Sequence, residues 1–306
     1  MIDAIQKDLL EKIADLHDVP AGAYNIRANG QLGGRHNTAN IEIITKKDKP
    51  GIDIIIKPNT RNESLHIPVV ITESGLTDLV YNDFYIGENS DVTIVAGCGI
   101  HNSGNKKSGH DGVHTFYVRK GARVKYVEKH YGTGDGNGEN IMNPKTVIEI
   151  EEGGYMEMET TQIKGIDSTD RITTARLDKD AKLVIHESLM THGKQYARTD
   201  FTIDLNGENS STNVVSRSVA KENSRQEFFS NINGNNKCTG HTECDAIIMD
   251  NARVKAIPEI NANHIDAGLI HEAAIGKIAG EQIIKLMTLG LTEQEAEEQI
   301  VNGFLK

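Results

Sequence analysis

The amino-acid sequence predicts a mainly β protein whose short strands coil into a parallel solenoid, with a helix at the N-terminus and a helical segment at the C-terminus. Three observations support this fold class. Apolar residues alternate with polar ones through most of the chain, a strand-entry pattern recurs about every 30 residues, and helical periodicity is confined to the two ends.

The first segment, residues 1–40, is predicted to be helical at its start and irregular afterwards. Ile2, Ile5, Leu9, Ile13 and Leu16 recur every three or four residues and form one apolar stripe. An isolated helix of this length is only marginally stable, so we expect it to dock on the rest of the protein.

Residues 41–265 are predicted to form the β core. Within this region, Phe201, Ile203 and Leu205 alternate with polar neighbours, and similar short runs end at Gly, Asn or Asp residues. A polar tetrad leading into a strand recurs at residues 89–92, 121–124, 153–156 and 180–183, and more loosely at 211–214 and 251–254. Regular self-similarity is typical of stacked coils, although an antiparallel sandwich is the alternative for short strands joined by glycine-containing turns.

The last segment, residues 266–306, is predicted to be helical. Apolar residues between Ile275 and Met287 share one face, the helix ends near Gly290, and Thr292 with Glu295 forms a capping box for a second helix. These helices either cap the open coil or provide a docking surface for a partner.

Composition narrows the classes of function. The chain has 306 residues, a net charge of −11 and no tryptophan, which disfavours nucleic-acid binding and aromatic carbohydrate platforms. We find no run of roughly 18 apolar residues and no signal peptide, so we expect neither a membrane span nor export. Three sparse cysteines then indicate free thiols in the reducing cytosol.

A glycine-rich stretch at residues 132–138 resembles a phosphate-binding loop only in composition. No Gly-Lys-Ser or Gly-Lys-Thr follows it, and no helix is predicted behind it. We therefore interpret it as a flexible surface loop and expect no nucleotide to bind this chain.

The segment from Cys238 to Cys244 is the first candidate metal site. Cys238, His241 and Cys244 place two thiols and an imidazole within seven residues, and such groups bind soft metals and iron–sulfur clusters. The spacing is not that of a zinc knuckle. The alternative is that the cysteines are small buried apolar residues.

Two further groups are candidates. His271 and Glu272 offer an imidazole and a carboxylate where the last helices are expected to begin, without the spacing of a zinc hydrolase. Cys98, with His101, His110 and His114, suggests a second metal site, and a coil turn carrying exposed histidines is the favoured alternative.

The C-terminal third resembles the SufB/SufD family of iron–sulfur cluster assembly proteins, and SufB in particular. The resemblance is carried by the segments 216–220, 241–249, 270–278, 290–292 and 301–304. It implies a right-handed parallel β-helix, a helical segment that binds a SufC-like ABC-type ATPase, and a cluster built where two β-helices associate. By the same resemblance, Cys244 matches the cysteine associated with the cluster, and His271 with Glu272 matches the His-Glu pair. Ile270 departs from the family pattern, which tends to have a carboxylate there.

The sequence hypothesis is therefore a non-catalytic cytoplasmic scaffold for a transient iron–sulfur cluster of unspecified nuclearity. Cys244 of one chain and His271 with Glu272 of the other are the expected ligands in a homodimer, and Cys238, His241 and Cys98 are weaker candidates. ATP is expected to bind the SufC-like partner, and a sulfur donor and apo iron–sulfur acceptor proteins are the other expected partners. The alternatives are a metal-free adaptor of the ATPase and a β-helical enzyme acting on polysaccharide.

Overall fold

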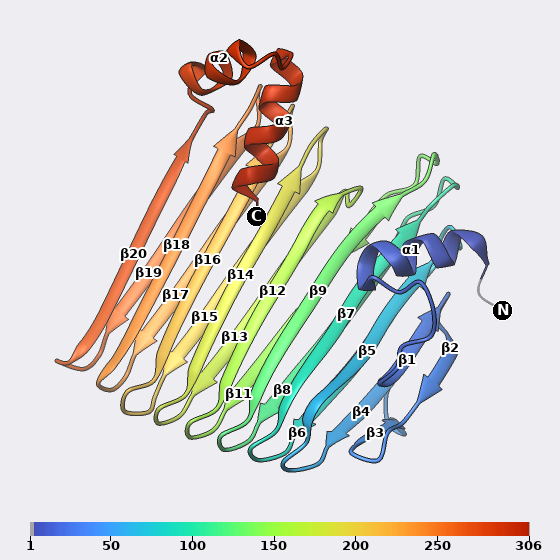
Figure 1. The fold of residues 1–306 in the computed structure, drawn as a ribbon, viewed down its shortest axis with the longest axis vertical. Coiled ribbons are helices and arrows are strands. Elements are labelled where there is room, and N and C mark those ends of the chain that lie inside the picture. The colour runs from blue at the N-terminus through green and yellow to red at the C-terminus, as the bar shows by residue number, and fades with distance from the viewer. Residues whose placement is uncertain (1–2, 306) are drawn as a thin grey trace.

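The computed structural model describes residues 3–305 and confirms a parallel β-solenoid with helices at both ends (Figure 1). Two ten-stranded sheets face each other, and successive coils add strands to each. Sheet A contains, in spatial order, β2 (Gln31–His36), β1 (Ala23–Ala28), β5 (Arg61–Ile71), β7 (Asp91–His101), β9 (Arg123–Thr133), β12 (Tyr155–Lys164), β14 (Lys182–Thr191), β16 (Ser211–Ala220), β18 (Cys238–Ile248) and β20 (Ala267–Gly276). Sheet B contains β19 (Arg253–Ala262), β17 (Arg225–Gly234), β15 (Tyr196–Leu205), β13 (Ser168–Leu177), β10 (Asn140–Met142) with β11 (Lys145–Ile150), β8 (Ser108–Val118), β6 (Thr77–Ile86), β4 (Gly51–Ile56) and β3 (Ile41–Thr45).

Strand direction distinguishes the solenoid from the sandwich. The described strands pair in parallel except at the N-terminal end, where β1 pairs with β2 and β3 with β4 antiparallel. Side chains alternate across each strand, so every second residue enters the core between the sheets. Phe201, Ile203 and Leu205 are buried there, as their spacing predicts. The antiparallel sandwich is therefore excluded.

The predicted repeat is correct in part. The tetrads from residue 89 to residue 214 all lead into or lie in strands of sheet A. The tetrad at 251–254 instead leads into β19 of sheet B, and the true register partner of Ser211 is Thr239. The inclusion of residues 251–254 in this repeat was wrong. Similar polar turns lead into the strands of both sheets, so the tetrad pattern does not tell a strand of sheet A from a strand of sheet B.

The N-terminal helix, α1 (Ala4–Ala14), packs on the outer face of sheet A. Asp3 and Gln6 form a capping box, and Leu9 and Ile13 are fully buried against β5 and β7. Ile5 is exposed, and Ile2 lies outside the described residues. Because β1 and β2 follow α1, strands begin well before the predicted boundary at residue 40.

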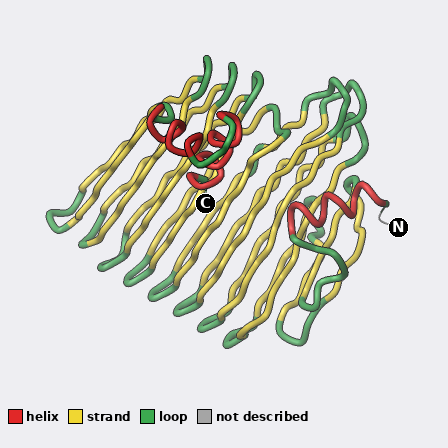
Figure 2. Tube along the Cα trace, turned by 45° about the horizontal axis from the view of Figure 1, so that its top comes forward, coloured by secondary structure: helices red, strands yellow, loops and turns green. Residues whose placement is uncertain are grey.

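The C-terminal segment differs from the prediction at its start. Residues 267–276 form β20, so the solenoid extends past residue 265, and the helices α2 (Gly280–Thr288) and α3 (Glu293–Phe304) follow. The predicted capping box of Thr292 and Glu295 is present. Ser188 Oγ on β14 donates to the carbonyl oxygen of Leu305 at 2.9 Å, which places α3 over the outer face of sheet A. In Figures 1 and 2, α3 lies across strands of sheet A and α2 lies beyond the ends of the strands, and neither helix stacks on the outer edges of β19 and β20.

We call the last coil, made by β19 and β20, the open end. These strands terminate sheets B and A, and the described chain pairs no further strand with their outer edges. Ile260, which lies on the inward face of β19 next to Ile232, is 45% exposed. The open end therefore presents two unpaired strand edges and part of the apolar interior.

The glycine-rich stretch 132–138 is a stacked turn. Gly136 N donates to Asn102 O and Gly138 N to Gly104 O, in the loop of the preceding coil. A β-carbon on Gly136 would stand 2.2 Å from the carbonyl oxygen of Gly104, so glycine permits this backbone stacking. The stretch is thus ordered against its neighbour, contrary to the flexible loop that we expected. Within residues 3–305, no helix combines the length and the apolar character that crossing a membrane requires.

Candidate metal centre at the open end

Strand β18 directs its chemically active side chains to two different faces. Cys238, Thr242 and Cys244 point into the solenoid, whereas His241 and Glu243 point outward. This separation follows from the two-residue period of a strand. The candidate segment is therefore split between the core and the outer surface.

Strand β20 divides its candidates in the same way. His271 pairs with Thr242 and points inward, whereas Glu272 pairs with Glu243 and points outward. Both residues lie within β20. His271 is nine positions and Glu272 eight positions before Gly280, where α2 begins, so they are not at a strand-to-helix junction as predicted. Because neighbouring residues of a strand face opposite sides, His271 and Glu272 do not share one face within a chain.

Cys244 and His271 form what we call the inner pair. They occupy adjacent strands two residues apart in register, which corresponds to a Cα separation of about 8 Å. Cys244 is 2% exposed and lies one coil from the open end, where its register partner is the small residue Ala273. Only this last coil lies between the Cys244 thiol and the unpaired strand edges of the open end.

The electrostatics of the inner pair favour a neutral thiol and a neutral imidazole. Burial, with smaller contributions from Glu187 and Asp245, raises the pKa of Cys244 to about 12. Burial and the neighbouring His241 lower the pKa of His271. Both ring nitrogens of His271 are buried and have no hydrogen-bond partner among the described residues. An unpaired buried imidazole is costly, and a metal ion is one ligand that would satisfy it.

His241, Glu243 and Glu272 form what we call the outer triad. One ligand atom from each residue lies within 4.8 Å of the others. His241 Nε2 is 3.5 Å from Glu272 Oε2, and His241 Nδ1 is 2.9 Å from Asn213 Oδ1. Donation from Nδ1 to the amide oxygen leaves Nε2 free to act as a ligand, the orienting role that outer partners of metal-bound histidines have.

Within the outer triad, the Glu243 carboxylate lies beside the like-charged Asp245. Burial and the adjacent Asp245 raise the pKa of Glu243, partly offset by Arg217 and His241. A bound cation would relieve this repulsion. One imidazole and two carboxylates suit a divalent transition metal such as Fe²⁺, Mn²⁺ or Zn²⁺.

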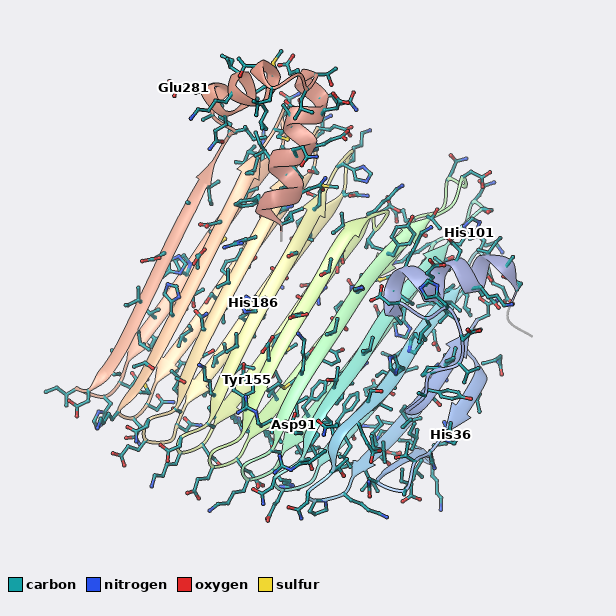
Figure 3. The ribbon with its side chains drawn as sticks, viewed as in Figure 1. His36, Asp91, His101, Tyr155, His186 and Glu281 are labelled. Carbon is teal, nitrogen blue, oxygen red and sulfur yellow. The ribbon has the colours of Figure 1, made fainter. Side chains whose placement is uncertain are left out.

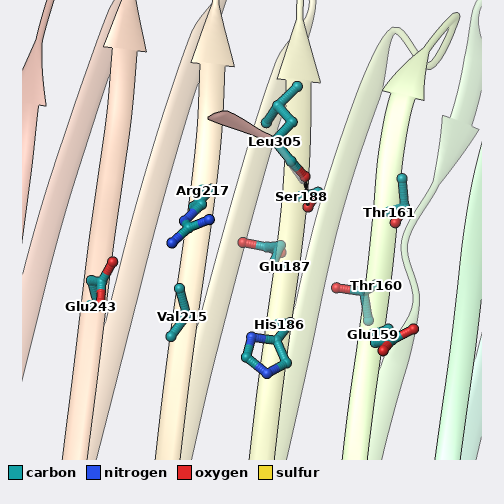
Figure 4. Close-up of a pocket in the computed structure, with 10 residues that line it drawn as sticks. All are labelled: Glu159, Thr160, Thr161, His186, Glu187, Ser188, Val215, Arg217, Glu243 and Leu305. Carbon is teal, nitrogen blue, oxygen red and sulfur yellow. Dashed lines mark hydrogen bonds between the residues drawn. The ribbon is translucent and has the colours of Figure 1, made fainter. Parts of the chain in front are cut away.

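A polar pocket adjoins the outer triad on sheet A (Figure 4). His186, Arg217 and Glu243 line it from neighbouring strands, and Leu305 after α3 closes one side. Glu243, Asn213 and the pocket residues were not predicted from the sequence as site residues. Their proximity depends on strand register across coils about 30 residues apart, which no local motif encodes.

The weaker candidates lie elsewhere. Cys238 is buried on the same face as Cys244 but six residues earlier along β18. Cys98 is buried on β7, and His110 and His114 are buried on β8 rather than exposed as we favoured. His101 is half-buried and hydrogen bonds to Ser103. The structure therefore brings none of the cysteines together. Figure 3 shows that His101 also lies far from His186, which lines the pocket beside the outer triad.

Comparisons with known proteins identify the family. Residues 74–304 match the family model described as the SufBD core domain of SUF-system FeS cluster assembly. An iron–sulfur cluster assembly SufBD family protein of Methanocaldococcus jannaschii is 30% identical over 79% of this chain and 76% of its own length. A SufBD family protein of Archaeoglobus fulgidus is 30% identical over 74% of this chain but 60% of its own length.

A shorter match links the chain to a bacterial member. The iron–sulfur cluster assembly protein SufB of Bacillus subtilis is 34% identical over 102 residues, which cover 32% of this chain and 22% of SufB. The family model covers most of the chain, and the resemblance noted in the sequence is confirmed. The chain belongs to the SufBD family of iron–sulfur cluster assembly proteins.

Proposed function

We propose that this chain is a non-catalytic scaffold on which iron and sulfide are assembled into a transient cluster at the open end. The observation that carries the proposal is the coincidence, in the last two coils, of a thiol, an unpartnered imidazole and a His–Glu–Glu group beside unpaired strand edges. Family membership supports the same role in iron–sulfur cluster assembly. The chain binds iron and the nascent cluster only transiently and passes the cluster on, so neither is a resident cofactor.

The occupant of the open end is proposed to be a second copy of the chain. Long unpaired edges are unusual on a stable monomer because they template further strand pairing. The edges of β19 and β20 also expose Ile257, Ile260 and Ile270. In a homodimer joined at the open ends, β19 and β20 of the two subunits would pair with each other and cover the part of the apolar interior that is exposed in one chain.

Joining two open ends would make their interiors continuous. In this arrangement Cys244 of one subunit faces His271 of the partner subunit across one layer of terminal strands. Thiolate binds iron tightly, whereas imidazole is a weaker ligand that permits transfer to an acceptor. Glu272, on the outward face, contributes through the outer triad, which we propose holds the incoming iron ion.

The ATPase is proposed to dock on the C-terminal helices. Helix α2 has no buried residue, and Ile284, Met287 and Leu289 are exposed on and just after it. Apolar groups presented this way suit a protein partner. In this proposal a SufC-like ABC-type ATPase binds and hydrolyses ATP, while the scaffold supplies no catalytic group.

Nucleotide-driven closure of the ATPase gives the covered site a means of opening. Since Cys244 is buried, iron, sulfide and acceptors reach it only when the terminal coil moves. Rigid-body movement of docked subunits is a common way to convert differential binding into such a displacement. A sulfur donor and apo iron–sulfur proteins are the remaining partners. Three free cysteines suit a reducing compartment, and we place this activity in the cytosol.

Anaerobic reconstitution tests the scaffold role. Wild type, Cys244→Ala and Cys238→Ala are incubated with ferrous iron and sulfide, and bound iron and acid-labile sulfide are measured per chain. Cys238 is the matched control because it is a buried thiol on the same face of β18. We expect loss of cluster only in Cys244→Ala. Equal cluster content in all three proteins would reject the role of Cys244, and no cluster in any would favour a metal-free adaptor.

Truncation tests the ATPase contact. A cut before Ala273 would divide β20, so the chain is ended after Ala279 instead, which removes α2 and α3 and leaves the strands intact. Co-purification with a SufC-like ATPase should be lost while circular dichroism retains its β signature. Unchanged binding would move the docking surface to the solenoid.

A further inference from the structure

The polar pocket beside the outer triad has the size of a small-molecule site. Its volume is about 500 Å³, which lies in the range of pockets that bind small ligands. Residues of β12, β14, β16 and β18 line it, and Leu305 closes one side (Figure 4). Because Glu243 lines the pocket and also belongs to the outer triad, an ion bound by the triad would lie at the edge of this pocket.

Arg217 is an unpaired cation in the pocket. It is half-buried on the outward face of β16, and within residues 3–305 its guanidinium forms no hydrogen bond or ion pair. The carboxylate of Glu159, across the pocket, is already paired with Lys125 at 2.7 Å. A guanidinium has five donors and no acceptor, and it binds a carboxylate through two parallel hydrogen bonds. Arg217 therefore suits a carboxylate supplied by a ligand.

The separation of Arg217 from the outer triad sets the length of that ligand. Glu243 pairs in register with Val215, so Arg217 lies on the adjacent strand and two residues further along, at a Cα separation of about 8 Å. Acetate is too short to contact both the guanidinium and an ion at the triad. A di- or tricarboxylate with a backbone of about four carbon atoms has the required length.

The outer triad leaves coordination positions for such a ligand. His241, Glu243 and Glu272 offer three ligand atoms, all from the outer face of sheet A. Divalent iron and manganese accept about six ligands, so about three positions stay open to groups from outside the chain. Carboxylate oxygens bind both ions. One carboxylate of the ligand can therefore bind the ion while another binds Arg217.

The local charges make binding of the carboxylate depend on the metal. Glu243, Asp245 and Glu272 place three carboxylates near one guanidinium, that of Arg217, and this arrangement repels an anion. A divalent cation at the triad balances the excess negative charge and bonds directly to the anion. Metal and carboxylate should therefore bind cooperatively, each raising the affinity for the other by the same factor.

We propose that this pocket binds a small di- or tricarboxylate, and that iron reaches the outer triad as a complex with it. One carboxylate of the ligand completes the coordination of the ion, and another accepts two hydrogen bonds from Arg217. The inference rests on the proposed role of the outer triad in receiving iron, and it adds the chemical form in which the ion arrives. When the iron moves on to the inner pair, the carboxylate loses the ion that holds it and dissociates.

Equilibrium dialysis with manganese(II) and radiolabelled citrate tests this site. Mn²⁺ stands in for Fe²⁺ because it is stable in air, and citrate is the tricarboxylate probe. The full chain is dialysed with citrate alone, with Mn²⁺ alone and with both. Citrate–Mn²⁺ complexes that form in solution are equal on the two sides of the membrane, so only the excess on the protein side is bound. We expect about one citrate per chain when Mn²⁺ is present and none without it, and radiolabelled acetate should not bind in either case.

Three variants make the test specific. With Mn²⁺ present, Arg217→Gln should bind citrate at least about tenfold more weakly, because a bidentate charged contact is lost. It should bind Mn²⁺ at least as tightly as wild type, since it removes a positive charge. Glu272→Gln should lose both. Arg123→Gln is the matched control, an exposed arginine on the same face of sheet A that stacks on Tyr155 outside the pocket, and it should bind both as wild type does. Circular dichroism checks that each variant is folded.

Two results overturn the proposal. One is equal citrate binding by wild type and Arg217→Gln, and the other is wild type that binds Mn²⁺ at the triad without binding citrate. A failure of the underlying role looks different, because wild type and Glu272→Gln would then bind Mn²⁺ equally and the triad would not be a metal site. These measurements need neither sulfide nor a partner, so they stay distinct from a failure of cluster assembly on Cys244.

Discussion

At the scale of single residues, side-chain direction decides which donors act together. Cys244 and His271 face the core, whereas His241, Glu243 and Glu272 face outward. The sequence identified the thiol and the imidazole because Cys and His are rare and chemically distinctive. It missed Glu243, because one glutamate among many is recognisable only from its register with Glu272.

The protonation of Cys244 gives a measurable consequence. Its pKa of about 12 lies above the pKa of 9.0 taken for an unperturbed cysteine, so the reactive thiolate is scarcer in the folded chain. At pH 8, alkylation of Cys244 by iodoacetamide should be at least about a thousandfold slower than in the unfolded chain. The folded-state rate should rise about tenfold per pH unit up to pH 10. Peptide mapping by mass spectrometry follows the residue, and equal folded and unfolded rates would refute the burial argument.

Arg171 gives a prediction for the core. Its guanidinium is buried and faces Glu128 and Glu187, so Arg171→Met removes this charge from beside two buried carboxylates, to which only hydroxyl groups and an imidazole then remain close. The free energy of unfolding should fall by about 3–5 kcal/mol in denaturant titrations. Arg176→Met is the control, because Arg176 is exposed and makes only a 3.9 Å contact with Asp204; its cost should stay below about 1 kcal/mol. Similar losses for the two variants would argue against an essential buried pair.

At the scale of elements, strands were predictable and their ends were not. The alternation of Phe201, Ile203 and Leu205 revealed a buried face directly. β20 was taken for part of a helical segment because its apolar residues, such as Ile275, also fit a helical period. Two further strands, β1 and β2, were missed because QLGGRH in β2 has little apolar alternation and its pairing with β1 is long-range information.

The open edges predict an effect on association. Ile270 on β20 is 56% exposed, and a lysine there would place a charge on the edge that we propose to be paired. Ile270→Lys should shift the chain from dimer to monomer in light scattering coupled to size exclusion, since edge lysines oppose strand pairing. Leu79→Lys on β6 is the matched control, an exposed apolar residue away from the open end. Dimers that persist in Ile270→Lys and dissociate in Leu79→Lys would place the interface elsewhere.

At the scale of the whole molecule, the solenoid brings together what the sequence separates. The stacked coils carry α1 at one end and the donor-bearing strands with α2 and α3 near the other (Figure 1). The overall fold was predictable because the same strand-and-turn pattern recurs in the sequence of successive coils. The arrangement at the open end was not, because it depends on which strand comes last and on where the helices fold back.

The central claim is that Cys244 of one subunit and His271 of the partner subunit bind the same nascent cluster. Cys244→Ala and His271→Ala chains are co-folded in equal amounts, and iron and sulfide are measured after anaerobic reconstitution. Each variant alone should hold no cluster. The mixture should recover about a quarter of the wild-type content, since half of the dimers are mixed and each contains one intact site of two. A mixture as empty as the separate variants would contradict a site shared between chains.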